Sequence, residues 1–181
     1  MKSRLPLIPT IVVALAVATM IALGIWQLQR KGEKEALIAL YAANADKPPI
    51  AFPDMAPVRD AEMFRISTLN CLEVVQWQSV SGRDTKGNAG FQYIADCKTG
   101  AEGPGALVAY GIADRPDIKP EWKGGMVNGT IITEPSRYGV IERMIGKIPV
   151  PRPMIVADRA SEDMRPVAQP DPKSVTNNHL S

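Results

Sequence analysis

Histidine is nearly absent from this sequence. Among 181 residues there is one histidine, His179, close to the carboxyl end. The body of the chain therefore cannot hold a Ser-His-Asp triad or a metal site with several histidines. No pairing of a nucleophile with a base stands out either, and this favours a protein without enzymatic activity.

Cysteine is scarce as well. The two cysteines, Cys71 and Cys97, are too few for a disulfide scaffold or a four-cysteine zinc site. They lie 26 residues apart, unlike the closely spaced pair of a copper chaperone. A structural disulfide, two buried thiols and a pair of metal ligands all remain open, and the disulfide suits an oxidising compartment.

An excess of positive charge is missing too. The 21 lysines and arginines are balanced by 19 aspartates and glutamates, and aromatic residues make up only 6% of the chain. Nucleic-acid-binding proteins usually carry a concentrated basic face, and those that bind single strands stack the bases on aromatic rings. The sequence therefore predicts no nucleic-acid partner.

What the sequence does contain is a long apolar run near the amino end. From Leu5 to Leu28 there are 24 residues without a formal charge. As a helix this run would span about 36 Å, more than the bilayer core of about 30 Å. Trp26 lies at its far end, where an amphipathic ring suits the headgroup layer, and Arg30 follows in water. The run predicts a transmembrane helix over 5–28.

A cleaved signal peptide is the alternative interpretation of this run. Ala14, Ala16 and Ala18 have the small side chains and the spacing that a cleavage site requires. Cleavage there would leave an apolar mature terminus from Thr19 to Leu28, so a retained membrane anchor is favoured. The short tail before the run and the long domain after it favour an amino terminus inside the cell.

The chain beyond the membrane helix divides into two predicted parts. Leu37, Leu40 and Tyr41 share one face at helical spacing, which predicts a helix that continues out of the membrane to about Asn44. We therefore expect a juxtamembrane helix over 29–47 and a β-rich domain over 48–181. Four prolines predict an extended linker at the start of that domain: Pro48, Pro49, Pro53 and Pro57.

Six short apolar runs in the domain have the composition of strands, because they are rich in Val, Ile, Tyr and Thr and bounded by turn residues. They are Met63–Thr68, Leu72–Val80, Phe91–Cys97, Ala106–Ile112, Gly125–Thr133 and Met154–Ala157. The turn-forming segment "KTGAEGPG", residues 98–105, predicts a hairpin between two of them. The expected fold class is mainly β (α+β), with an antiparallel, barrel-like domain after the membrane helix. Periodicity does not decide whether Arg137–Ile145 is helix or strand.

Motifs at both ends of the chain resemble those of one known family. The segment "LGIWQLQRKGEKEALI", residues 23–38, is similar to the Leu-Gly-x-Trp-Gln-x-x-Arg motif that closes the first membrane helix of the Surfeit locus protein 1 family. The segment "QPDPKSVTNNHLS", residues 169–181, resembles the Asn-His-Leu-x-Tyr motif that opens the second membrane helix of that family. The segments "FRISTLNCLEV", "GNAGFQYIADC" and "KGGMVNGTIITEPSR" are similar in the same order. The resemblance covers nearly the whole chain.

Two departures from the family pattern are visible. Where the family commonly has Val-Asn-Arg-Gly-Trp, this chain has "VAYGIA", residues 108–113, and lacks the arginine and the tryptophan. The sequence also stops at Ser181, where the family would enter its second membrane helix. A truncated record and a lost second anchor are both compatible with this ending, and a site built between two helices would then be incomplete.

The resemblance implies an assembly factor for cytochrome c oxidase, which assists formation of the haem a centre of subunit I. It implies subunit I and other assembly factors as partners. It also implies an inner-membrane protein of a bacterium, with its main domain on the periplasmic side. Some members bind haem through a histidine near the second membrane segment, and His179 occupies the matching position. Haem a is thus the implied cofactor, with His179 as its iron ligand.

Trp26, Gln27 and Arg30 complete the set of candidate site residues. Trp26 would form a wall of the haem site beside Gln27 and Arg30, and the guanidinium of Arg30 matches a propionate carboxylate in a two-point contact. Three of the four candidates also have a simpler interpretation: Trp26 can be an interface anchor, Arg30 a headgroup contact and His179 a solvated tail residue. The alternative function is a membrane-anchored periplasmic protein-interaction module that does not bind haem.

Overall fold

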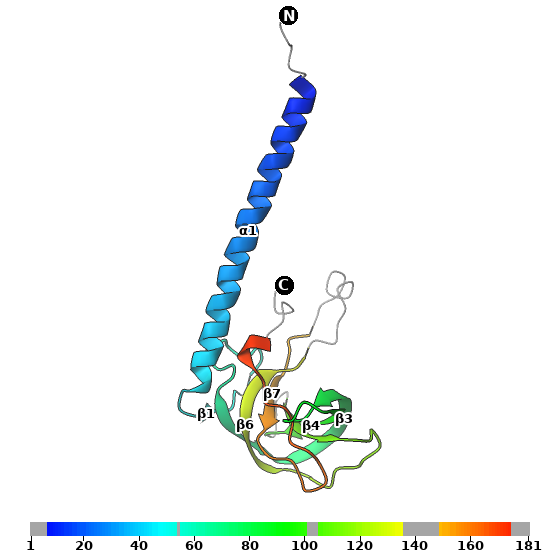
Figure 1. Cartoon of the computed structure of the whole chain (residues 1–181). Coiled ribbons are helices and arrows are strands. Elements are labelled where there is room, and N and C mark those ends of the chain that lie inside the picture. Colours follow the sequence, from blue (N-terminus) through cyan, green and yellow to red (C-terminus); the bar gives the residue numbers. More distant parts are fainter. Residues whose placement is uncertain (1–6, 54, 101–104, 136–148, 175–181) are drawn as a thin grey trace, which may run out of the picture. The chain divides into compact units, whose positions relative to one another are not determined.

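The computed structural model describes residues 7–53, 55–100, 105–135 and 149–174 of the chain. Contacts between residues divide it into two compact units, one up to Ala39 and the other from Leu40 onward. The first unit is helical, and the second is built on a seven-stranded sheet (Figure 1). The predicted segment Arg137–Ile145 lies outside the described residues.

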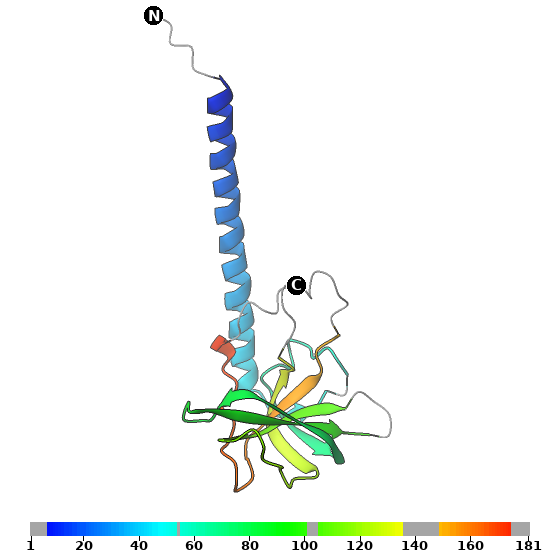
Figure 2. The same ribbon diagram turned by 90° about the vertical axis from the view of Figure 1, so that its right-hand side faces the viewer.

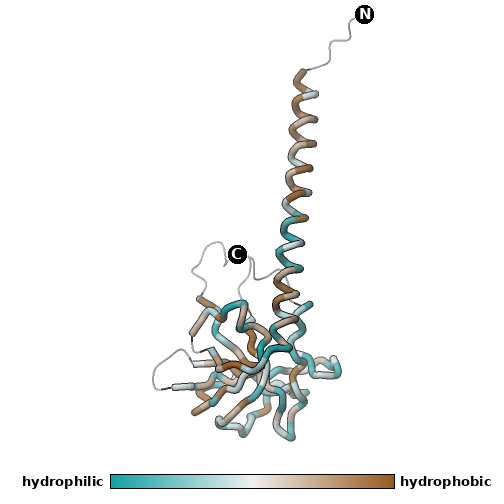
Figure 3. Tube along the Cα trace, turned by 90° about the vertical axis from the view of Figure 1, so that its left-hand side faces the viewer, coloured by the Kyte–Doolittle hydropathy of each residue, from teal (hydrophilic) through white to brown (hydrophobic). Residues whose placement is uncertain are grey.

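A single helix, α1 (Leu7–Ala45), contains both the apolar run and the polar stretch that follows it. The predicted continuation of the helix to about Asn44 is therefore confirmed. Figure 3 shows mostly apolar residues along the first part of this helix. Its most apolar 18-residue window has a mean hydropathy of 2.4, and none of that window is buried. The apolar side chains of this window are therefore free to meet an apolar surrounding such as a bilayer. By length and composition, α1 is the one helix in the described residues that can cross a membrane.

All six predicted strands are confirmed, with ends shifted by at most three residues. The structure adds one short strand, β1, inside the stretch predicted to be a linker. The strands are β1 (Ile50–Ala51), β2 (Ile66–Cys71), β3 (Glu73–Arg83), β4 (Ala89–Lys98), β5 (Ala106–Ala113), β6 (Gly125–Thr133) and β7 (Pro153–Ala157). A short 3₁₀ turn, η1 (Pro172–Ser174), ends the described part of the chain.

The strand order of the sheet is β1-β2-β6-β7-β5-β4-β3. Four pairings are antiparallel, including the predicted β4–β5 hairpin, but β1–β2 and β5–β7 are parallel. The sheet is therefore mixed. The expectation of a barrel-like domain is wrong, because β1 and β3 are open edges that do not pair with each other. Turn residues predict hairpins between consecutive strands, but they do not show that β7 is inserted between β5 and β6.

A disulfide joins Cys71, the last residue of β2, to Cys97 in β4, with the two Cα atoms 5.3 Å apart. Three other strands lie between β2 and β4 in the sheet order, so the sheet is strongly twisted and curved (Figure 2). The amide of Leu72 donates to the carbonyl of Lys98 at 2.9 Å beside the disulfide. Of the three states that the sequence left open for the cysteines, the disulfide is therefore the one observed.

The hydrophobic core occupies both faces of the central strands. In β7, Ile155 and Ala157 join one buried cluster, while Met154 and Val156 join another. Successive side chains of a strand point to opposite faces, so the two clusters lie on opposite faces of the sheet. This explains why β5 and β7 are apolar at nearly every position, rather than at every second position.

The last turns of α1 belong to the sheet unit and are fixed there by polar contacts. Asn44 is fully buried, and its amide nitrogen donates to the backbone carbonyls of Asp60 at 2.9 Å and Met63 at 3.0 Å. The Tyr41 hydroxyl donates to the Asp60 carboxylate at 2.8 Å, and the Tyr41 ring packs 4.9 Å from that of Phe64. Burial, followed by the contact with Asp60, raises the pKa of Tyr41 well above its usual value.

Asp84 organises the turn between β3 and β4 and has an exposed fraction of only 2%. Its carboxylate accepts hydrogen bonds from the amides of Lys86 and Asn88, and from Arg165 Nη1 at 2.5 Å. Burial alone would raise the pKa of Asp84. The hydrogen bonds from Asn88, Arg165 and Lys86 outweigh burial and lower that pKa to about 2. Arg165 also donates a hydrogen bond to Asp114, which follows β5. The arginine therefore connects the turn after β3, the end of β5 and the segment after β7.

We expect the stability of the sheet unit to fall between about pH 4 and pH 2. The folded-state pKa of Asp84 lies below its ordinary value of 3.8, so its ionised form stabilises the fold above about pH 4. That contribution disappears as the pH falls through the folded-state pKa. Urea unfolding of the full chain in detergent, followed by tryptophan fluorescence at several pH values, measures the change.

Two substitutions sharpen this prediction. Asp84→Asn removes the titrating group and should flatten the pH dependence in this window. Asp114→Asn is the matched control, since Asp114 is highly exposed although it bonds to the same arginine, and it should leave the pH dependence almost unchanged. If both variants follow the parent curve, Asp84 is not the group responsible.

Candidate functional site

Three of the four candidate site residues lie in α1, within a stretch of five residues. Trp26 and Arg30 are four residues apart, so they lie one turn apart on the same face of the helix. The Trp26 side chain is 58% exposed, and Gln27 is exposed as well. This stretch therefore presents a large amphipathic ring, an amide and a cation to the surroundings of the helix.

Arg30 has only a weak partner within its helix. Its Nη1 lies 3.5 Å from a carboxylate oxygen of Glu33, and both side chains are exposed, by 39% and 70%. Exposed pairs of this kind contribute about 0–1 kcal/mol. The guanidinium is therefore available to a stronger anionic partner, such as a propionate or a lipid headgroup.

The fourth candidate, His179, lies outside the described residues. Its role as an iron ligand stays a prediction. Within the described part of the chain, no group of three or more His, Cys, Asp or Glu side chains is placed to hold a metal ion.

Sequence reasoning missed a cluster of aromatic side chains in the sheet unit. Trp77 of β3 contacts Tyr93 of β4, Tyr110 of β5 and Trp122 edge to face, with ring centroids between 5.9 and 6.4 Å apart. Tyr110 and Trp122 stack, with centroids 4.7 Å apart and planes inclined by 13°. Four of the ten aromatic residues of the chain are thus in one place. No local motif could have shown this, because the four residues lie on three strands and a loop.

A pocket of about 410 Å³ adjoins the stacked pair. It is formed where β5, the start of β6 and the segment after β7 meet. Its walls are Tyr110, Trp122, Met126, Val127, Asn128, Asp158, Arg159 and Ala160. The pocket therefore combines an aromatic wall, an exposed thioether and charged groups of both signs.

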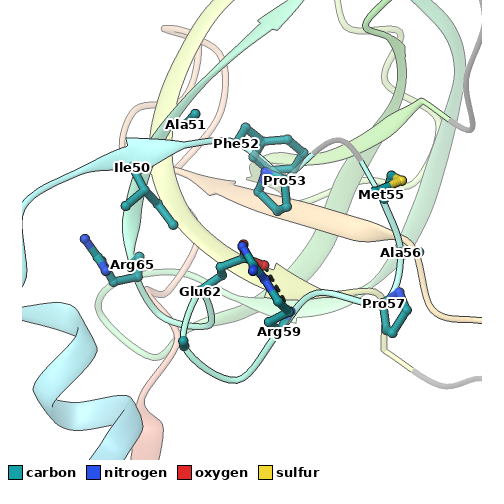
Figure 4. A pocket seen from close by; sticks show the side chains of 11 residues that line it. Ile50, Ala51, Phe52, Pro53, Met55, Ala56, Pro57, Arg59, Glu62 and Arg65 are labelled. Atoms are coloured by element: carbon teal, nitrogen blue, oxygen red, sulfur yellow. Dashed lines mark hydrogen bonds and ion pairs between the residues drawn. The ribbon is translucent and has the colours of Figure 1, made fainter.

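A second, larger hollow of about 860 Å³ lies beside β1. Figure 4 shows Phe52 and Pro53 on one side of it, and Met55 and Pro57 along another. Arg59 and Glu62 form an ion pair with each other on the side away from Phe52. The hollow is mostly apolar, and of its charged side chains Arg59 and Glu62 pair with each other, while Arg65 donates to the backbone carbonyl of Pro48.

Comparison with known proteins gives one match. The model of the SURF1 family, that is the Surfeit locus protein 1 family, matches residues 14–181. A search of curated proteins and a search of solved structures each found no match. The matched region includes both the Trp26 motif and the segment around His179 from which the resemblance was first drawn. The SURF1 family is a family of assembly factors associated with cytochrome c oxidase. Since the match covers nearly the whole sequence, the chain belongs to the SURF1 family.

Proposed function

We propose that this protein is an assembly factor that assists formation of the haem a centre in subunit I of cytochrome c oxidase. The observation that carries the proposal is the family match over residues 14–181, in a chain whose first helix is long and apolar enough to cross a membrane. Subunit I and other assembly factors are the proposed partners.

The proposed location is the inner membrane of a bacterium, with the sheet unit in the periplasm. The apolar helix α1 supports anchoring in a membrane. The Cys71–Cys97 disulfide supports the periplasmic side, because disulfides form and persist in the periplasm and are rare in the cytosol.

Haem a is the proposed cofactor, with His179 as the iron ligand. The described residues fit this proposal, since the guanidinium of Arg30 is held only by an exposed glutamate at 3.5 Å and can exchange it for a propionate. Trp26 offers an exposed ring to an apolar macrocycle, and Gln27 offers an amide beside it. When bound, haem a supplies an iron centre whose redox chemistry belongs to the cofactor rather than to the chain.

The second candidate function is a membrane-anchored periplasmic protein-interaction module without haem. The aromatic pocket of the sheet unit favours it, because tryptophan, tyrosine, methionine and arginine are the residues enriched at protein interfaces.

Deleting the gene in its native bacterium tests the assembly role. We expect the haem a signal per subunit I to fall severalfold in difference spectra of membranes, and the full-length chain supplied in trans to restore it. The haem b signal and the amount of subunit I on immunoblots are the internal controls. An unchanged ratio of haem a to subunit I in the deletion strain would refute the proposal. A normal ratio together with a loss of other oxidase subunits would support the interaction module instead.

A further inference from the structure

The pocket beside the Tyr110–Trp122 stack presents hydrogen-bond donors that have no acceptor among the described residues. Arg159 is exposed and makes no hydrogen bond or ion pair within the part of the chain that the structure describes. The Trp122 indole and the Tyr110 hydroxyl likewise have no acceptor among the described residues. Burial raises the pKa of Tyr110, so its hydroxyl stays protonated and remains a donor. A ligand that brings acceptors therefore finds partners in this pocket.

The charged groups of the pocket restrict the ligand further. A guanidinium binds a carboxylate through two parallel hydrogen bonds, which is the strongest pairing available to it. Asp158 also lines the pocket and would repel a second carboxylate placed near it. Tyr110 and Trp122, which stack on each other, both line the pocket and offer ring surface for a contact with another ring. These groups together fit one carboxylate next to one aromatic side chain.

The rim of the pocket resembles a protein interface rather than a small-molecule site. Met126 is 69% exposed at the edge of the pocket. Leu72 is 58% exposed, and its backbone lies close to that of Gly124, which is between Trp122 and Met126 in the chain, although Leu72 does not line the pocket itself. Large exposed apolar side chains gathered around a pocket mark interaction surfaces, and methionine adapts well to varied partners.

We infer that this pocket docks a segment of a partner protein in which an aromatic residue is followed by a single acidic residue. The ring lies against Tyr110 and Trp122, and the carboxylate pairs with Arg159. Met126 and Leu72 contact the flanking residues of the segment. The inference goes beyond the proposed role in haem a formation and does not depend on haem binding.

The test is an NMR titration of the full chain in detergent, with nitrogen-15 in its tryptophan indoles. The probe is a capped dipeptide of phenylalanine and aspartate, and the matched peptides carry asparagine or lysine in place of aspartate. We expect the probe to shift the Trp122 indole signal saturably, with a dissociation constant of about 1 mM or tighter. Trp122→Phe identifies that signal by removing it.

Two arginine variants locate the contact. Arg159→Gln should weaken binding of the aspartate peptide about tenfold or more, because a charge-assisted hydrogen bond is lost. It should bring that peptide to the affinity of the asparagine peptide. Arg115→Gln is the matched control, since Arg115 is an exposed arginine of the same unit that pairs with Asp117, and it should bind like the parent.

Three results would overturn the inference. One is the absence of any shift of the Trp122 signal at peptide concentrations of several millimolar. Another is equal binding of the aspartate and asparagine peptides to the parent chain. The third is a shift that appears on raising the protein concentration without peptide, which would show that a second copy of the chain occupies the pocket. Haem content does not enter any of these measurements, so failure here and failure of the proposed haem role are distinguishable.

Discussion

Replacing both Cys71 and Cys97 by alanine is expected to lower the free energy of unfolding of the sheet unit by about 3–4 kcal/mol. The disulfide closes a loop of 26 residues, and its loss returns conformational freedom to the unfolded chain. The bond also connects two strands that the sheet order keeps apart, so no backbone ladder between β2 and β4 can replace it. Urea unfolding of the full chain in detergent, followed by tryptophan fluorescence, measures the difference.

Reduction provides the control for the alanine substitutions. The parent chain unfolded and refolded in a thiol reductant should reach nearly the same midpoint as the double variant. The single variant Cys97→Ala should match the double variant, because one cysteine cannot form the bond. A double variant as stable as the oxidised parent would show that the disulfide contributes nothing to the fold.

Such a loss is large beside the marginal stability of most domains, which is about 5–15 kcal/mol. The sheet has open edges at β1 and β3, and β1 contains only two residues, Ile50 and Ala51. The disulfide fixes the corner where β2 is followed by β3, and it joins two strands that do not pair with each other in the sheet.

The positions of the strands could be predicted from sequence because each strand carries its own local signal. Val108 and Ile155, for example, lie in short apolar runs that are bounded by turn residues, and both runs form strands. The long helix was predictable for the same reason, since an uncharged run followed by helical periodicity is visible without any tertiary information.

The arrangement of the strands could not be predicted in the same way. β7 lies between β5 and β6 because its five residues are buried on both faces, which is a tertiary property. β1 forms in a proline-rich stretch because Ile50 and Ala51 find a parallel partner at Ser67 and Thr68. A two-residue strand of this kind has almost no sequence signal.

In the candidate site, too, local sequence signals predict one part, and only the folded structure shows the other. The short motif around Trp26 points to one face of α1, and the structure places Trp26 and Arg30 on that face, one turn apart. The pocket at Trp122 and Arg159 combines residues 37 positions apart with a third from β5, so only the folded sheet reveals it. The pairing of Arg165 with Asp84, 81 positions away, escaped prediction for the same reason.

The role proposed for His179 leads to the second large expected effect. In cells that make haem a, His179→Ala should lower the haem a content of the purified protein at least about tenfold. Loss of an outer-shell partner of a metal ligand already lowers metal affinity about 10–100-fold, and loss of the ligand itself removes more. Pyridine haemochrome spectra of the full chain in detergent measure the content, with urea unfolding of the same samples as the check on folding.

Variants of α1 separate binding of the iron from binding of the rest of the haem. Arg30→Gln should lower haem retention only about two- to fivefold, because an exposed ion pair contributes about 1 kcal/mol or less. Lys31→Gln is its matched control, since Lys31 is the next residue of the helix and pairs with Glu35, and it should retain haem like the parent. Trp26→Ala should lower both haem retention and anchoring in the membrane, whereas Trp26→Phe keeps an aromatic ring and should lower them less.

The pattern across these variants decides between the two candidate functions. A large loss for His179→Ala, a small loss for Arg30→Gln and none for Lys31→Gln supports a haem site that includes these residues. An unchanged haem a spectrum in His179→Ala ends the ligand proposal, because an iron ligand cannot be removed without a spectral change. Oxidase assembly that persists in that variant would then rest on protein contacts alone, which is the function of the interaction module.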